Sequence, residues 1–410
     1  AGEKNGPDVF QVLFLGLLFG VTWAANPWAM PPTLAAIALL LVATSNRWHW
    51  PTGEGLRRWL SIAAVALCGW LATAPFHLGF NPFFQGIKPV FAWTDPGHLL
   101  LYAGCLLIPV CIAAFALLGS MLGTDRVVSR SVLLLVLAAT AVLAAATGRP
   151  TLVILAVVLL ILVVSVIGAG AGTDRPVLAL AALGVFLLLV PEVLYVADNY
   201  GDALHRKNTV FKAYIQAWPL LAISLPVMLH LGLRRPAARA TILGICLVLA
   251  LPHPVGIIVQ QLKAEERGLD GIAWMSSGDQ AIVRALRREP PGTQIIEAVG
   301  GAYTEYARLS AASGVPAYLG WANHESVWRG NDILEETDRR NELVSRLYSC
   351  ADPAEVRRLA HEAGIDLVAI GSLEHDDYSS DQLHAVAAAG DVILDKDGGM
   401  LVRFATPDTR

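Results

Sequence analysis

Long apolar runs without a charge fill most of the first 255 residues and limit what this chain can fold into. Residues 131–146, SVLLLVLAATAVLAAA, contain no Asp, Glu, Lys or Arg. A helix needs about 20 such residues to cross the hydrocarbon core of a bilayer. Because lipid cannot satisfy unpaired backbone groups, runs of this kind are expected to be helical. The sequence therefore predicts a mainly α-helical polytopic membrane protein.

Nine membrane spans are predicted from these runs. Only 16% of the residues are charged, whereas a soluble domain typically carries about 25%. The spans cover residues 8–25, 29–45, 58–75, 97–121, 129–147, 150–168, 176–195, 209–233 and 237–254. The lipid bilayer is therefore the first predicted partner.

The charged residues gather in the last third of the chain. About 25 of the 34 acidic residues lie beyond residue 262. We therefore expect a transmembrane helical domain at 1–255, a linker or amphipathic connection at 256–270, and a separate domain at 271–410. The net charge of −4 and the lack of a long basic run give no indication of a nucleic acid partner.

Strand-like and helix-like segments alternate in residues 271–410, which predicts a small α/β domain. Strands are expected at TQIIEAV, VPAYLGW and IDLVAIGS, and a hairpin with DGG at its turn is expected in DVILDKDGGMLVRFA. Asp352 and Glu355 have the spacing of a capping box at the start of a helix.

The Lys and Arg residues of the short loops predict an orientation. Arg57, Arg126, Arg175 and Arg234 belong to loops on one side, which should be cytoplasmic. The opposite, extracytoplasmic side then holds the N-terminus, the 198–208 loop and the C-terminal domain. Because the opening AGEKNGPD is no signal peptide, we expect a fragment that an odd number of spans precedes.

A cationic stretch, DNYGDALHRKNTVFKAYIQAW, interrupts the apolar runs at residues 198–218. Arg206, Lys207 and Lys212 suit a phosphate at the membrane face, and Glu192 is a costly carboxylate at a span edge. The alternative is an interfacial loop whose cations extend toward water and whose Glu192 pairs with a lysine. The predicted substrate- and phosphate-binding residues here are His205, Arg206, Lys207, Asn208, Lys212 and Tyr214.

A second polar stretch, GWANHESVWRGND, covers residues 320–332. Trp321 and Trp328 suit stacking on a sugar or a lipid headgroup, and His324, Glu325 and Arg329 suit a polar ligand. The stretch is no HExxH zinc motif, because position 328 is Trp. The alternative is a Trp-rich patch that docks on the bilayer interface or on the span loops.

Other features indicate packing rather than chemistry. The five cysteines form no CxxC pattern and no metal-type spacing, so they are interpreted as small apolar residues. GLLFG at 16–20 matches GxxxG and predicts close helix packing. No cofactor or metal ligand set is indicated, and a divalent metal stays open. Asp95, in the loop 81–98, is a further candidate acid or base.

Two segments together resemble a known family. RKNTVFKAYIQAW, followed by EAVGGAYTEYARLSAASGVPAYLGWANHESVWRG, is similar to the YYY multi-pass membrane proteins of Chloroflexus-like bacteria and archaea, a family of unknown function. The matching positions are Asn208, Thr209, Val210, Phe211, Lys212, Tyr214, Gln216, Trp218, Glu297, Tyr303, Thr304, Gly320, Trp321, His324, Glu325, Trp328 and Arg329. Lys207 and Ile215 depart from the family's Met and Tyr. The turn NPWAMPPT is similar to the family's N-T-W-D-x-P-T segment, but Ala29 stands where that segment has Asp.

The resemblance implies a fold like that of polyprenyl-phosphate-dependent membrane glycosyltransferases. It implies a lipid-phosphate-linked sugar as partner and an external active site, with the acidic catalytic residue in a first external loop that would precede Ala1. Glu192 or Asp198 would then substitute as the catalytic base. Two alternatives stay open: a transporter or flippase, for which inverted repeats are expected, and a non-catalytic assembly protein.

Overall fold

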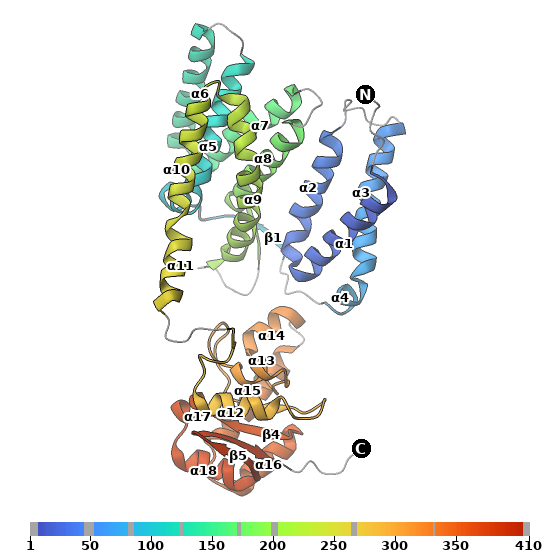
Figure 1. The fold of residues 1–410 in the computed structure, drawn as a ribbon, viewed down its shortest axis with the longest axis vertical. Coiled ribbons are helices and arrows are strands. Elements are labelled where there is room, and N and C mark those ends of the chain that lie inside the picture. Colours follow the sequence, from blue (N-terminus) through green and yellow to red (C-terminus); the bar gives the residue numbers. More distant parts are fainter. Residues whose placement is uncertain are drawn as a thin grey trace. The chain divides into compact units, whose positions relative to one another are not determined.

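A computed structural model gives the fold of the chain (Figure 1) and describes residues 7–44, 53–80, 86–122, 126–169, 174–197, 204–263, 269–330 and 333–404. The described residues are mostly helical, as expected for the fold class. The chain forms two compact units. The helical unit comprises residues 1–79 and 84–259, and the α/β unit comprises residues 80–83 and 260–410.

The helical unit consists of apolar helices with a small two-stranded antiparallel sheet. In chain order its elements are α1 (Val9–Ala25), η1 (Pro27–Ala29), α2 (Met30–Ala43), α3 (Gly53–Ala72), α4 (Ala74–Gly79), β1 (Ile87–Pro89), α5 (Pro96–Met121), α6 (Arg126–Thr147), α7 (Pro150–Gly168), α8 (Asp174–Leu189), η2 (Val190–Glu192), β2 (Leu194–Val196), α9 (Lys207–Gly232), α10 (Pro236–Ala250) and α11 (Pro252–Lys263).

Five helical stretches in the described part of the chain are long and apolar enough to cross a membrane. They are Pro96–Met121, Pro150–Gly168, Asp174–Glu192, Lys207–Gly232 and Pro236–Lys263. Three shorter apolar helices, Val9–Ala25, Pro27–Ala43 and Ser131–Thr147, correspond to further predicted spans. The described helices thus support a membrane protein with several spans, while the count of nine stays a prediction.

Helices α5, α7, α8 and α9 pack into the main core of the helical unit. Leu155 of α7, Leu188 of α8 and Leu221 of α9 are among its fully buried side chains. An apolar core holds helices together in lipid by close packing rather than by exclusion of water. This core fixes where the polar ends of α5, α7 and α9 lie.

The GxxxG stretch packs closely, as predicted. Helix α1 lies against α3, and a Cβ atom added at Gly20 would collide with the backbone of Gly69. A Cβ atom at Gly16 would collide with the side chain of Cys68. Both glycines are therefore required for the approach of the two helices.

The predicted seventh span, 176–195, is shorter as a helix. Helix α8 ends at Leu189, and after η2 the chain becomes extended in β2, which pairs antiparallel with β1. The backbone N–H of Val196 donates to Thr209 Oγ1 at 3.0 Å, which also keeps this segment extended. The predicted connection 256–270 is helical as far as Lys263, so α11 runs across the boundary between the two units at residue 259.

The α/β unit has a four-stranded sheet with the strand order β3-β4-β6-β5. Its elements are α12 (Ser277–Leu286), β3 (Ile295–Ile296), α13 (Arg308–Ser313), α14 (Ala322–Arg329), α15 (Leu334–Ser349), α16 (Pro353–Ala363), β4 (Leu367–Ile370), α17 (Ser372–Asp377), α18 (Ser380–Ala389), β5 (Asp391–Lys396) and β6 (Gly399–Arg403). Strands β3 and β4 are parallel, and the other neighbours are antiparallel. The predicted hairpin is confirmed, with Asp397 and Gly398 at positive φ in its turn.

Two local expectations for the α/β unit are wrong. VPAYLGW is no strand, because Pro316 has no N–H to donate and only an isolated bridge joins Ala317 to Ile295. The capping box is also incomplete. Asp352 accepts from the N–H of Ala354 as a helix cap, but Glu355 forms ion pairs with Arg358 and Arg346 instead.

Candidate functional site

A buried ion pair lies at one end of the helical unit, where α5 and α9 begin. Arg206 Nη1 donates to Glu192 Oε1 at 2.9 Å and to the carbonyl of Pro191 at 2.9 Å. The side chain of Glu192 is fully buried, and that of Arg206 is 14% exposed. Glu192 is thus paired, as the alternative interpretation required, but with an arginine and not with a lysine.

Thr94 completes this cluster from a distant part of the chain. Its backbone N–H donates to Glu192 Oε2 at 2.9 Å, and its hydroxyl donates to Glu192 Oε1. The same hydroxyl accepts from Arg206 Nη2 at 2.9 Å. Both carboxylate oxygens of Glu192 therefore have partners. Buried charges are tolerated when they are paired and hydrogen-bonded in this way.

His205 is buried between aromatic rings beside the ion pair. Its ring stacks on Phe91 with 3.8 Å between centroids and meets Tyr195 edge-on at 4.6 Å. The pairing of β1 with β2 brings these rings together, since Phe91 follows β1 and Tyr195 belongs to β2. The ring of His205 therefore packs on Phe91 and Tyr195 next to the ion pair.

The other predicted residues of this stretch lie on the first turns of α9. Lys207 is exposed, Asn208 and Lys212 are half-buried, and Tyr214 is buried with its ring 5.3 Å from that of Tyr102. Lys212 Nζ lies 5.3 Å from the centre of the Phe211 ring. Asp198 lies outside the described residues. Asp95, the further acid or base candidate, accepts from the N–H of Gly97 and caps α5.

The α/β unit contains a pocket of about 750 Å³. Its wall includes the aromatic side chains Trp274, Tyr306 and Trp321 and the polar residues Thr304, Glu305, Arg308, His324 and Glu325. Three of the residues predicted for substrate binding, Trp321, His324 and Glu325, therefore line one pocket. Arg329 is exposed and lies outside this lining, and the side chain of Trp328 lies outside the described part.

The polar residues of the pocket wall are held in place by local hydrogen bonds. Trp321 Nε1 donates to the carbonyl of Tyr306 at 2.7 Å, and Glu325 Oε1 accepts from the N–H of Gly320 at 3.2 Å. Tyr303 Oη lies 3.0 Å from His324 Nε2, and the two rings meet edge-on. The wall is thus formed before any ligand arrives.

Two residues that shape this wall have an unusual backbone conformation. Tyr303 and Ala307 both have a φ of 64°. A non-glycine residue in this region costs of order 1–3 kcal/mol, and such residues cluster at ligand sites. Tyr303 and Ala307 flank the segment that carries Thr304, Glu305 and Tyr306 into the pocket.

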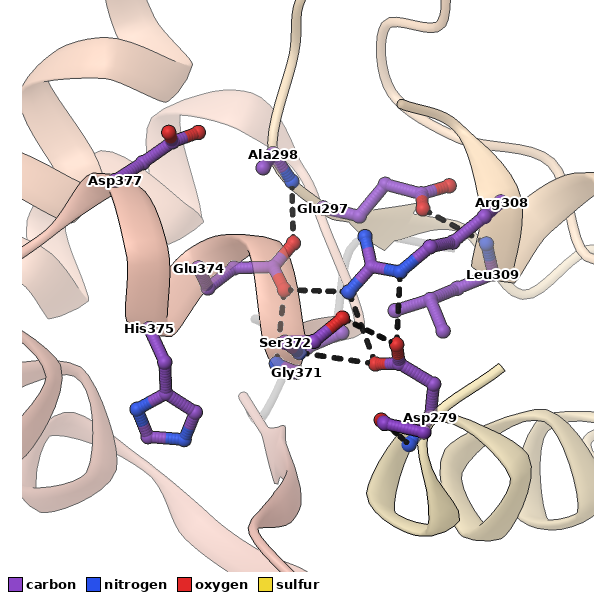
Figure 2. Close-up of polar contacts among 12 residues, drawn as sticks. Asp279, Glu297, Ala298, Arg308, Leu309, Gly371, Ser372, Glu374, His375 and Asp377 are labelled. Atoms are coloured by element: carbon purple, nitrogen blue, oxygen red, sulfur yellow. Dashed lines mark hydrogen bonds and ion pairs between the residues drawn. The ribbon is translucent and has the colours of Figure 1, made fainter. Parts of the chain in front are cut away.

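A buried network of charged residues adjoins the pocket through Arg308, and Figure 2 shows its members pointing toward one another. Arg308 Nε donates to Asp279 Oδ2 at 3.0 Å, and Arg308 Nη2 donates to Asp279 Oδ1 at 2.9 Å and to Glu374 Oε2 at 3.2 Å. Ser372 adds hydrogen bonds to both oxygens of Asp279 from its N–H and its hydroxyl. The network joins α12, α13 and α17.

The remaining carboxylate oxygens of this network accept backbone N–H groups. Glu374 Oε1 accepts from Ala298 at 2.7 Å, and Glu297 accepts from Leu309 at 2.9 Å and Ser310 at 3.0 Å. Glu297 and Ala298 follow β3, and Glu374 follows β4. Ligands of open α/β sheets commonly lie at the carboxyl ends of the strands. This network lies at the carboxyl ends of β3 and β4.

Burial and hydrogen bonding shift the pKa values of this network in different directions. Burial raises the pKa of Glu297 more than its backbone hydrogen bonds lower it. Burial also acts to raise the pKa of Asp279, but the hydrogen bonds from Arg308 and Ser372 outweigh it and lower that pKa. Asp279 is therefore held as an anion that fixes Arg308.

No sequence pattern indicated that Asp279, Arg308 and Glu374 form a cluster. Each resembles an ordinary charged residue of an amphipathic helix or a loop, and 66 residues separate Arg308 from Glu374. No group of three or more His, Cys, Asp or Glu side chains among the described residues is arranged to hold a metal ion.

Comparison with known proteins concerns mainly the helical unit. A family model with the description "uncharacterized membrane protein (DUF2298)" matches residues 2–221, more than half of the chain. The chain belongs to the DUF2298 family. No curated protein and no solved structure matches it.

The DUF2298 match includes the ion pair of Glu192 and Arg206 and ends within α9. It supports the resemblance to a multi-pass membrane family of unknown function and a location in the membrane. The pocket of the α/β unit lies beyond the matched residues.

Proposed function

We propose that this DUF2298 protein is a membrane glycosyltransferase-like enzyme that uses a lipid-phosphate-linked sugar at the external membrane face. The observation that carries the proposal is the pocket of about 750 Å³, which combines Trp274, Tyr306 and Trp321 with His324 and Glu325. A pocket with aromatic walls and a few fixed polar groups is typical of small-molecule recognition. Aromatic faces suit the apolar faces of a sugar ring, and the polar groups suit its hydroxyls.

Considered separately, the helical unit also has cations that suit a lipid phosphate. Arg206, Lys207 and Lys212 lie together at the start of α9. We assign Glu192 a positioning role, because both of its oxygens are engaged by Thr94 and Arg206. Glu192 would thereby fix the guanidinium of Arg206 and offset its charge, and Lys207 and Lys212 would supply the positive charge for the phosphate.

In the proposed transfer, the bond between the sugar C1 and the phosphate oxygen breaks, and a bond from C1 to an acceptor hydroxyl oxygen forms. The phosphate leaves with the bonding electron pair on its lipid, and a base takes the acceptor proton. Cations beside the phosphate stabilise its developing charge. Because both carboxylate oxygens of Glu192 already accept hydrogen bonds, Asp198 is the proposed base.

The proposal includes nine spans and an extracytoplasmic α/β unit. A cysteine at the fully exposed Leu269 should react with an impermeant thiol reagent from outside intact cells. A cysteine at the exposed Thr44 should react only after the cells are opened. Both variants would be made in a chain without its native cysteines. The reverse pattern would overturn the external site.

The activity is tested by incubating the purified full chain with labelled polyprenyl-phosphate sugars. We expect His324→Ala and Lys212→Ala to reduce transfer at least tenfold. Matched controls are His375→Ala, an exposed histidine outside the pocket, and Lys263→Ala, an exposed lysine at the end of α11. Absence of both transfer and donor binding in the unmodified chain would refute the proposal.

A further inference from the structure

We propose that an apolar groove between α5, α6 and α7 holds the hydrocarbon chain of a polyprenyl phosphate, with Arg149 at its headgroup end. This inference rests on the proposed function and names where its lipid binds. The groove has a volume of about 540 Å³ and lies wholly within the helical unit. It extends along α5 from Leu99 to Phe115 and is closed by Leu137 of α6 and Ile154 of α7.

The groove wall consists almost entirely of hydrocarbon. Its one hydroxyl, that of Thr151, is satisfied because it donates to the carbonyl of Thr94 at 2.7 Å. The thiol of Cys111 is only a weak hydrogen-bonding group. A cavity without polar partners does not hold ordered water and accepts apolar ligands instead. An alkyl or prenyl chain is the apolar ligand that a bilayer supplies.

One end of the groove is suited to an anion. Helices α5 and α7 both begin there, at Pro96 and Pro150, so the positive ends of two helix dipoles point to the same side. Arg149 directly precedes α7 and is exposed, and its guanidinium carbon lies 3.9 Å from the centre of the Trp93 ring. Stacking on Trp93 fixes this cation two residues before Thr151 of the groove wall.

A chain of hydrogen bonds links the groove wall to the proposed phosphate site. Thr151 lines the groove and bonds to Thr94, and Thr94 bonds in turn to Glu192 and Arg206. A lipid whose chain lies along α5 would therefore bring its phosphate between Arg149 and the start of α9. A single chain with one phosphate satisfies both the apolar groove and its charged end.

The test measures lipid binding to the purified full chain by native mass spectrometry. The probes are a polyprenyl phosphate, the matching polyprenol and phosphatidylglycerol. Ile108→Trp places a larger side chain in the groove, and Leu101→Trp adds the same side chain on the same helix at a position 86% exposed and outside the groove. We expect Ile108→Trp to weaken polyprenyl phosphate binding about tenfold and Leu101→Trp to leave it unchanged.

The headgroup end is tested separately. Arg149→Gln should weaken binding of polyprenyl phosphate but not of polyprenol, and Arg234→Gln, at an exposed loop arginine, should change neither. The groove assignment would be overturned if the two Trp variants bound polyprenyl phosphate equally well. It would also be overturned if phosphatidylglycerol displaced polyprenyl phosphate as effectively as unlabelled polyprenyl phosphate does. Sugar transfer that survives in Ile108→Trp would overturn the groove and leave the enzyme standing, whereas groove binding without any transfer would overturn only the enzyme.

Discussion

Arg308 and Asp279 form a two-point ion pair in the interior of the α/β unit, with donor–acceptor distances of 3.0 and 2.9 Å. Their side chains are 1% and 2% exposed. The pair ties the start of α12 to the segment that forms the pocket wall. A charge in such a place is stable only while its partner is present.

Replacing Asp279 should therefore destabilise the α/β unit. In Asp279→Asn the guanidinium of Arg308 keeps only Glu374 as a charged partner, and breaking a buried pair costs about 3–5 kcal/mol. The measurement is hydrogen exchange of the β4 amides in the full chain. Glu355→Gln, which removes an exposed ion pair with Arg358, is the control and should not alter this exchange. Unchanged protection in Asp279→Asn would show that the pair is not required.

The two carboxylates of the network should give opposite pH dependence. The pKa of Asp279 is lower in the folded state, so its stabilisation is present above its ordinary pKa of 3.8 and is lost as the pH falls further. The pKa of Glu297 is raised, so stability is lost as the pH rises from its ordinary value of 4.5 through the raised value. Hydrogen exchange of the β4 amides would be measured as a function of pH. In Glu297→Gln the loss of stability with rising pH should disappear. A profile in that variant identical to that of the unmodified chain would contradict the assignment.

Loss of the Glu192 carboxylate should destabilise the helical unit. Glu192→Gln leaves the guanidinium of Arg206 without its charged partner in an apolar surrounding, for which we expect a cost of about 3 kcal/mol. Thermal unfolding in detergent, followed by a dye that reacts with newly exposed thiols, would report it. If Glu192 were only a base, the variant would keep its unfolding temperature and lose activity alone.

The contact of α1 with α3 should not tolerate a side chain at Gly20. In Gly20→Leu the new Cβ atom meets the backbone of Gly69, which cannot move aside, and overpacking costs about 1–3 kcal/mol. Gly244→Leu, where the added Cβ atom meets nothing within 4 Å, is the control. The same thiol dye assay should show a lower unfolding temperature for Gly20→Leu only. Equal temperatures for both variants would argue against a close contact in the membrane.

The site could be predicted only in part. GWANHESVWRGND drew attention to Trp321, His324 and Glu325 because aromatic and charged residues together are unusual, and these three line one pocket. The same stretch suggested Arg329, which lies outside the lining. Thr304 and Tyr306 reach the pocket because Tyr303 and Ala307 adopt positive φ, a conformation that no local sequence pattern requires.

The sequence by itself determined that the chain enters a membrane and that its polar part forms a separate α/β unit. Hydrophobic runs and alternating periodicities are local properties, and burial of the apolar surface enforces them in any fold. Only the tertiary structure decided that Glu192 pairs with Arg206 and Thr94, and that Asp279, Arg308 and Glu374 meet. Thr94 lies 98 residues before Glu192, and Arg308 lies 66 residues before Glu374. The sequence does not distinguish a charged residue that is buried with a partner from one that is exposed to water, because packing in the folded state decides which residues lose their water.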